Sequence, residues 1–162
     1  MNYTDENIRN ILKNVKTIAM VGASPNWVRP SSFAMKYLLG KGYRVIPVNP
    51  GHAGKEILGQ TVYASLSDIP GNIDMVDIFR NSDAAGAIMD EAIGLAEAKN
   101  ISVVWMQLGV VNEDAAKRGV AAGLNVIMDR CPKIEYARLF GELGWGGINT
   151  GIISSKRPKL RA

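Results

Sequence analysis

The chain alternates between short runs of consecutive apolar residues and longer segments in which apolar residues recur every three or four positions. Short runs are typical of buried strands, and the longer period is typical of helices. The predicted strands are Thr17–Val21, Tyr43–Val48, a short one near Thr61–Tyr63, Met75–Phe79, Ser102–Gln107 and Asn125–Met128. The predicted helices are one that Thr4 caps, then Ser32–Lys41, Ala84–Lys99, Glu113–Ala122 and Ile134–Glu142. This order predicts an α/β fold in three layers, with a mostly parallel sheet.

The carboxyl ends of the predicted strands are where a ligand is expected. In an open parallel sheet, ligands bind beyond these ends, at the point where the strand order reverses. The residues that follow the strands are Gly22–Ser24, Val48–Pro50, Phe79–Asn81, Leu108–Gly109 and Asp129–Cys131. The segment 51–59 has three glycines and no period, and it is predicted to be a loop beside this site.

The segment after the first strand has the features of a phosphate site. Val21 leads into a turn at Gly22, and Arg29, Ser31 and Ser32 stand where the next helix begins. Backbone N–H groups at such a turn attract anions, and a guanidinium forks onto phosphate oxygens. For Arg29 the alternative is a solvated loop residue, and for the two serines it is a role as helix caps alone.

Length and composition are those of a single compact domain. The chain has 162 residues, of which 47% are apolar and 21% are charged. No apolar window approaches the roughly 20 residues of a membrane helix, and a start with Asp5 and Glu6 is not typical of a signal peptide. The single cysteine, Cys131, excludes an intrachain disulfide and fits a reducing compartment. We expect a cytoplasmic protein without a membrane partner.

The net charge of +4 belongs to the end of the chain. Lys156, Arg157, Lys159 and Arg161 lie in the last seven residues, and without them the basic residues equal the 15 acidic ones in number. A neutral body without a basic and aromatic stripe is not typical of a nucleic-acid-binding domain. The tail is interpreted as a solvated end, with contact to a partner as the alternative.

A nicotinamide dinucleotide is a common ligand of Rossmann-like folds, but two features disfavour it here. The turn reads Gly22-Ala-Ser-Pro-Asn-Trp27 instead of the G-x-G-x-x-G fingerprint. The acidic residue that binds the ribose after the second strand is replaced by Asn49. An asparagine still hydrogen-bonds a hydroxyl, so a nicotinamide-dependent oxidoreductase stays among the alternatives.

Six short motifs, in this order, resemble a known family. They are Val21-Gly-Ala-Ser-Pro25, Val48-Asn-Pro-Gly51, Gly59-Gln-Thr-Val-Tyr63, Val76-Asp-Ile-Phe-Arg80, Val104-Trp-Met-Gln-Leu-Gly109 and Asp129-Arg-Cys-Pro-Lys133. Together they resemble the small stand-alone CoA-binding proteins, which are similar to the N-terminal CoA-binding domain of the succinyl-CoA synthetase alpha subunit. The resemblance covers Val15 to Leu143. It implies a single Rossmann-like domain over residues 1–143 that binds coenzyme A or an acyl-CoA at the strand ends. A glycine-rich segment and the basic tail follow over 144–162.

The resemblance also implies contacts for individual residues. Gly22, Ala23 and Ser24 match the loop whose backbone amides meet the pyrophosphate. Two further segments match the two sides of the adenosine. Their residues are Val48, Asn49 and Pro50 on one side and Ile78, Phe79 and Arg80 on the other.

Three of the implied contacts have alternatives or depart from the pattern. His52 falls where the synthetase domain has a phosphate-binding lysine, and the nearby Lys55 is a candidate to supply the charge. For Arg80 the alternative to a ligand contact is an ion pair with Asp77 or Asp83. For Phe79 the alternative to stacking on adenine is a place in the core.

Catalysis has one candidate residue. Cys131 follows a strand beside Arg130 and precedes Pro132, a good first residue for a helix. A cation and a helix N-terminus favour a thiolate, which exchanges with thiols such as that of CoA. The alternative is a buried, inert cysteine. One cysteine and one histidine do not make a zinc site without carboxylates, so no metal is expected.

We therefore predict a binding or regulatory protein for CoA or an acyl-CoA, rather than an enzyme. The alternatives are the oxidoreductase and an enzyme that acts on an acyl-CoA or a thiol through Cys131. A protein partner or a homo-oligomer is compatible with the glycine-rich segment and the tail. The sequence leaves open whether the ligand is free or acylated CoA.

Overall fold

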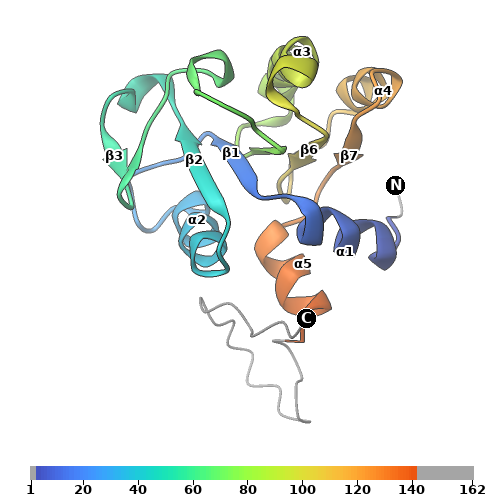
Figure 1. Ribbon diagram of the computed structural model, residues 1–162, viewed down its shortest axis with the longest axis horizontal. Coiled ribbons are helices and arrows are strands. Elements are labelled where there is room, and N and C mark those ends of the chain that lie inside the picture. Colours follow the sequence, from blue (N-terminus) through green and yellow to red (C-terminus); the bar gives the residue numbers. More distant parts are fainter. Residues whose placement is uncertain (1–2, 142–162) are drawn as a thin grey trace.

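The sheet of the protein is built from five parallel strands (Figure 1). In the computed structural model, which describes residues 3–141, they are β1 (Thr17–Val21), β2 (Arg44–Val48), β5 (Met75–Ile78), β6 (Val103–Met106) and β7 (Asn125–Ile127). Their order in the sheet is β2-β1-β5-β6-β7. The chain steps from β1 to β2 and then crosses back to the other side of β1. The strand order therefore reverses between β1 and β5, which is where a ligand crevice is expected.

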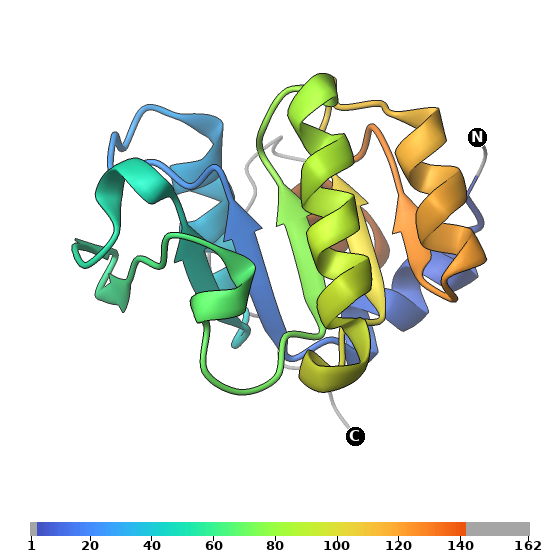
Figure 2. The same ribbon diagram turned by 90° about the horizontal axis from the view of Figure 1, so that it is seen from above.

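Helices cover both faces of this sheet (Figures 1 and 2). On one face lie α1 (Asp5–Asn14), α2 (Pro30–Gly40) and α5 (Pro132–Leu139), and on the other lie α3 (Ser82–Lys99) and α4 (Glu113–Ala121). Strands β5 and β6 are buried at every position, because each of their faces has a helical layer. The expected Rossmann-like, three-layer α/β fold in a single domain is confirmed.

Between β2 and β5 the chain forms only short elements. They are the 3₁₀ helices η1 (Pro50–His52) and η2 (Leu66–Asp68) and the strands β3 (Glu56–Ile57) and β4 (Gln60–Thr61). The prediction of a loop throughout 51–59 is wrong, because Leu58 and Gly59, both at positive φ, close a hairpin between β3 and β4. The strand expected near Thr61–Tyr63 is reduced to β4 and one isolated bridge between Val48 and Tyr63.

Helix ends follow the capping residues. Thr4 caps α1 as predicted, since its hydroxyl accepts a hydrogen bond from the backbone N–H of Asn7 at 3.1 Å. Helices α2 and α5 each begin two residues earlier than predicted, at Pro30 and Pro132. Proline suits the first helical position because it has no N–H group to leave without a partner there.

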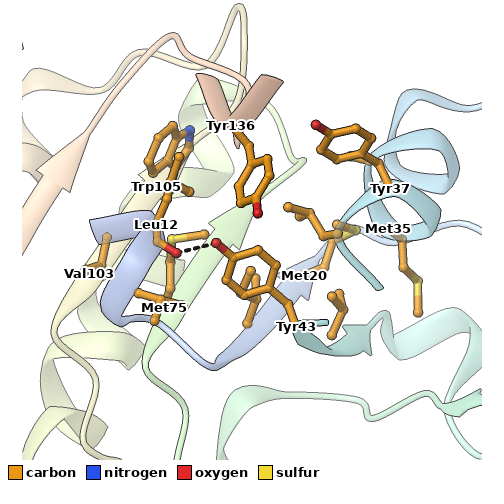
Figure 3. Close-up of a cluster of buried hydrophobic side chains, with 14 of the residues drawn as sticks. Leu12, Met20, Met35, Tyr37, Tyr43, Met75, Val103, Trp105 and Tyr136 are labelled. Carbon is orange, nitrogen blue, oxygen red and sulfur yellow. Dashed lines mark hydrogen bonds between the residues drawn. The ribbon is translucent and has the colours of Figure 1, made fainter. Parts of the chain in front are cut away.

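A cluster of aromatic side chains fastens α1 and α5 to the sheet (Figure 3). The ring of Tyr136 meets those of Tyr37 and Tyr43 edge to face, with centroids 6.0 and 6.1 Å apart. The hydroxyl of Tyr43 donates a hydrogen bond to the carbonyl of Leu12 in α1. Trp105 is fully buried, and its Nε1 donates to the carbonyl of Arg130 at 2.9 Å. This last bond holds the segment that leads from β7 to α5.

Some predictions fall on residues outside this description. Glu142, the predicted end of the last helix, and the glycine-rich segment and basic tail over 144–162 lie beyond residue 141. Within residues 3–141, no helix combines the length and the apolar character that spanning a bilayer requires.

Candidate functional site

The loop between β1 and α2 is held close to the neighbouring strand ends by Gly22. Its N–H donates to the carbonyl of Val48 at 2.9 Å, and its φ of +90° is one that side chains disfavour. A Cβ atom at this position would lie 2.9 Å from the carbonyl oxygen of Phe79 and 3.0 Å from Cδ of Arg80. Only glycine therefore allows β1, β2 and β5 to end so close together.

The serines at the start of α2 hold the loop rather than cap the helix. The hydroxyl of Ser31 accepts from the N–H of Ser24 at 3.1 Å, and that of Ser32 donates to the carbonyls of Ser24 and Asn26. The N-cap position belongs to Arg29, whose side chain makes no capping bond. The alternative of Ser31 or Ser32 as the helix cap is thus wrong, because Pro30 starts the helix before them.

A cavity of about 420 Å³ opens between this loop and the ends of β5 and β6. We call it the central cavity. Its lining residues are Gly22, Ser24, Arg29, Pro30, Ser31, Phe79, Gln107, Leu108 and Val110. Arg29 is exposed at this cavity, which leaves its guanidinium available to an anion. The cavity lies at the reversal of strand order, where the sequence predicted a ligand.

Gln107 is the site residue that sequence reasoning missed. The residue is only 8% exposed, and within residues 3–141 its Oε1 is buried with no hydrogen-bond partner, although the residue lines the central cavity. A buried carbonyl oxygen without a donor is costly and is uncommon in folded proteins. Its sequence signal was a polar side chain directly after the apolar run Val103–Met106.

A second cavity of about 280 Å³ lies on the other side of the strand ends. We call it the lateral cavity. It is lined by Val21, Val48, Pro50, Ala64, Ser65, Leu66, Arg80, Ala84, Ala87, Ile88 and Glu91. Glu91 of α3 also braces the wall of this cavity, because its Oε1 accepts a hydrogen bond from the N–H of Leu66 at 2.7 Å.

The two cavities are lined by neighbouring residues at the ends of β1 and β5. Val21 lines the lateral cavity and Gly22 the central one, while Phe79 lines the central cavity and Arg80 the lateral one. Consecutive residues of each strand end therefore face opposite cavities. An extended ligand that crosses Gly22 can occupy both, which one compact ligand cannot.

For Phe79 the sequence left open a place in the core or a contact with the ligand, and for Arg80 an ion pair or a contact with the ligand. Phe79 is half-buried and packs against the core while it also lines the central cavity. Arg80 is exposed, and within the described chain it forms no ion pair with Asp77 or Asp83. The residue lines the lateral cavity, with its Cδ beside Gly22.

Asp77 lies in β5 two residues before Phe79, so the two side chains are on the same face of the sheet. It is fully buried and sits beside Met20 and Trp105 in the strand register. In the part of the chain that the structure describes, neither carboxyl oxygen has a hydrogen-bond partner. Burial raises the pKa of this carboxyl well above its usual value.

The remaining predicted residues differ in what they present to a ligand. Asn49 uses its side chain to bind the protein itself, since Nδ2 donates to the carbonyl of Ala23 and Oδ1 accepts from Gly51. The side chains of Ala23 and Ile78 are buried in the core, so only their backbone can face a ligand. His52, the last residue of η1, is half-buried, and Lys55, three residues later, is exposed.

Cys131 does not line either cavity. It is 7% exposed and stands at the N-cap of α5, where its thiol makes no capping bond. This placement favours the interpretation of a buried, inert cysteine over that of a nucleophile facing the ligand.

Comparison with known proteins decides the family. A family model described as a CoA binding domain matches residues 16–137. The chain belongs to this family of CoA-binding domains. The resemblance identified from the six sequence motifs is thereby confirmed.

Several relatives match this CoA-binding protein over nearly their whole length. YneT of Bacillus subtilis is 37% identical over 136 residues, which are 84% of this chain and 96% of YneT. A solved structure from Pyrococcus horikoshii is 42% identical, with a TM-score of 0.80, and covers 86% of this chain and 94% of its own. One from Thermus thermophilus is 36% identical, with a TM-score of 0.76, and covers 85% and 100%. A dinucleotide-forming acetyl-coenzyme A synthetase of Ca. Korarchaeum cryptofilum, at 24% identity and a TM-score of 0.57, shares the fold.

Proposed function

We propose that the protein binds coenzyme A across both cavities, with the adenosine in the lateral cavity and the pantetheine arm in the central one. The observation that carries this proposal is that Gly22, which lines the central cavity, lies directly beside Arg80, which lines the lateral one. CoA is a ligand of this form, since a phosphate bridge joins a flat aromatic base to a long amide-containing arm. Membership of the CoA-binding family supports the same ligand.

The lateral cavity has the walls that a purine needs. Val48, Pro50 and Ile88 supply apolar surface, and the guanidinium of Arg80 supplies a plane for stacking on the base. Glu91 offers a carboxylate oxygen as an acceptor for an exocyclic amino group. Stacking, apolar contact and a hydrogen bond are interactions that an uncharged purine base can make.

The phosphates of CoA meet two sets of groups in this arrangement. The pyrophosphate crosses the turn at Gly22 and Ser24, within reach of the Arg29 guanidinium that lines the same cavity. The 3′-phosphate of the ribose lies toward His52 and Lys55, which follow Pro50 of the lateral cavity. A cationic side chain gives a phosphate contact worth more than a neutral hydrogen bond.

The chemistry of the central cavity supports binding or regulation rather than turnover. Its lining includes one cation and no carboxylate, imidazole or thiol. The hydroxyl of Ser31 is already engaged by the loop backbone. The proposed function is therefore to bind CoA, in a binding or regulatory role, without converting it.

Calorimetric titration with CoA, dephospho-CoA, NAD and ATP tests this proposal. We expect CoA to bind most tightly and dephospho-CoA about tenfold more weakly, because it lacks the 3′-phosphate. The Lys55→Gln variant should lower the ratio of the CoA affinity to the dephospho-CoA affinity. Lys117 is an exposed lysine of α4, and Lys117→Gln should leave this ratio unchanged. Tighter binding of NAD than of CoA would contradict the proposal and favour the oxidoreductase.

The unpartnered oxygen of Gln107 provides a second prediction. An amide N–H of the pantetheine arm is the donor that this acceptor lacks, so Gln107→Leu should weaken CoA binding about tenfold. Binding of adenosine 3′,5′-bisphosphate, which has no pantetheine arm, should not change. The fold should be at least as stable, since an apolar side chain removes a buried acceptor without a donor.

The other glutamine of the chain serves as the matched control. Gln60 lies in β4 and lines neither cavity, so Gln60→Leu should leave both affinities unchanged. An equal loss for CoA and the bisphosphate in Gln107→Leu would instead mean that the substitution distorts the whole site.

A further inference from the structure

The side chain of Asn49 joins the two loops that border the candidate site. Its Nδ2 donates to the carbonyl of Ala23 at 2.9 Å, and its Oδ1 accepts from the N–H of Gly51 at 2.9 Å. Both chain neighbours of Ala23 line the central cavity, and both chain neighbours of Asn49 line the lateral cavity. One amide therefore connects the backbone beside one cavity to the backbone beside the other.

The amide of Asn49 is also the one hydrogen-bonding group that ties the loop 23–29 to a distant segment. The backbone of Asn49 is itself anchored, since its N–H donates to the carbonyl of Tyr63 at 2.9 Å and its carbonyl accepts from the N–H of His52 at 3.1 Å. In the described part of the chain, every other hydrogen bond of the loop 23–29 stays within the loop or goes to α2. The position of this loop relative to the lateral cavity therefore depends on Asn49.

This arrangement requires an amide at position 49, because one of the two bonds needs a donor and the other an acceptor. A carboxylate would keep the bond from the N–H of Gly51 but would offer no hydrogen to the carbonyl of Ala23. In nicotinamide-binding folds, an acidic residue after the second strand accepts a hydrogen bond from a ribose hydroxyl. The amide of Asn49 instead bonds to the backbone of its own chain on both sides.

We propose that Asn49 is a positioning residue, whose amide holds the loop 23–29 in place for the pyrophosphate of CoA. This inference rests on the proposed function, in which the pyrophosphate crosses this loop and the adenosine occupies the lateral cavity. Asn49 acts through Ala23 and not on the ligand. Because the loop is already in place, CoA does not have to order it on binding, which is a cost that lowers affinity.

Titration of the parent protein, Asn49→Asp and Asn49→Ala with CoA and with 3′-AMP tests this inference. 3′-AMP has the adenosine and the 3′-phosphate of CoA but no pyrophosphate. At pH 8 we expect each variant to bind CoA at least about tenfold more weakly than the parent does. The affinity of Asn49→Asp for 3′-AMP should stay within about threefold of the parent, because the carboxylate keeps the bond to Gly51. Equal losses for CoA and 3′-AMP in Asn49→Asp would overturn the inference.

Lowering the pH should restore the lost bond in Asn49→Asp. A protonated carboxyl has an O–H that donates to the carbonyl of Ala23 and an oxygen that accepts from Gly51. The CoA affinity of Asn49→Asp should therefore approach that of the parent as the pH falls from about 8 toward the ordinary pKa of aspartate, about 4. His52 and the ligand phosphates are common to both titrations, so their effect cancels in the ratio of the two affinities.

Asn49→Ala separates the lost bond from repulsion between a new carboxylate and the phosphates of CoA. This variant adds no charge and has no proton to gain, so its loss of CoA affinity should persist at low pH. If Asn49→Ala binds CoA as tightly as the parent at pH 8, repulsion explains the loss in Asn49→Asp, and the inference is wrong.

Hydrogen exchange of the ligand-free protein tests the same bond without CoA. Four N–H groups of the loop 23–29 are hydrogen-bonded within it or to α2, so the exchange of this segment reports its order. Exchange should be faster in both Asn49 variants than in the parent. Asn125→Asp is the matched control, since Asn125 is also half-buried and its Nδ2 donates to Oδ1 of Asn7 at 2.8 Å, at the start of β7. It should change neither the exchange of the loop nor the CoA affinity.

The remaining results separate this inference from the proposal on which it rests. Failure of the parent protein to bind CoA would overturn the proposed function and the inference with it. CoA binding by the parent, with the same affinity in both Asn49 variants, would overturn the inference alone. The same holds for loop exchange that neither Asn49 variant accelerates, or that Asn125→Asp accelerates equally.

Discussion

Replacement of Gly22 by alanine is expected to destabilise the protein and to remove its CoA affinity. The backbone at this position has a φ of +90°, and the new Cβ would lie 2.9 Å from the carbonyl oxygen of Phe79. Strain of this kind costs roughly 1–3 kcal/mol, and a clash with backbone adds a similar amount. We expect the free energy of unfolding in urea to fall by roughly 2–4 kcal/mol. CoA affinity should fall at least about tenfold, because the loop must move away from β5.

Gly71→Ala separates the two contributions to this effect. Gly71 also has positive φ, +82°, but a Cβ there would have nothing within 4 Å, and the residue lines neither cavity. It should cost only the backbone strain, roughly 1–2 kcal/mol, and leave CoA affinity unchanged. Equal losses of stability in the two variants would show that the close approach of β1 and β5 at Gly22 contributes nothing.

The second large effect is expected at Asp77, through the pH dependence of stability. The folded protein binds the proton of this carboxyl more tightly than the unfolded chain, because burial without partners raises its pKa in the fold. Stability is then greatest below the unfolded pKa, about 4, and falls as the pH rises toward the folded pKa. The slope reaches at most about 1.4 kcal/mol per pH unit.

Asp77→Asn should remove this slope, since the amide has the same shape and no titrating proton. The variant should be more stable than the parent at neutral and alkaline pH, and the advantage should shrink toward pH 4. Urea unfolding of both proteins from pH 4 to pH 9 measures the difference, in which other titrating groups cancel.

Asp90→Asn is the control for this measurement. Asp90 is exposed and forms an ion pair with Arg118 at 2.9 Å, so its loss should change stability by less than about 1 kcal/mol. A stability difference between Asp77→Asn and the parent that does not vary with pH would contradict a raised pKa in the fold.

The elements themselves were predictable because their signals are local. Continuous apolar runs such as Val103–Met106 are buried on both faces, and that burial needs helices on either side. The errors at α2 and α5 are shifts of two residues toward a proline. The hairpin of β3 and β4 was missed because two-residue strands have no detectable period.

The candidate site was predictable only in part. Position after a strand identified Gly22, Ser24, Phe79 and Arg80, which all line a cavity. Position alone did not separate residues that face a ligand from those that hold the backbone. The side chain of Asn49, expected to line the adenosine, is hydrogen-bonded to Ala23 and Gly51.

The sequence by itself determined the α/β class, the glycine turn at Gly22 and the resemblance to CoA-binding proteins, because these depend on residue order and local period. The tertiary structure decided that consecutive residues at the ends of β1 and β5 face two different cavities. It also left Gln107 and Asp77 buried without partners. The physical reason is that a hydrogen-bond partner or a cavity wall comes from segments far apart in the chain. Which polar groups are satisfied is therefore settled only when the sheet and its two helical layers come together.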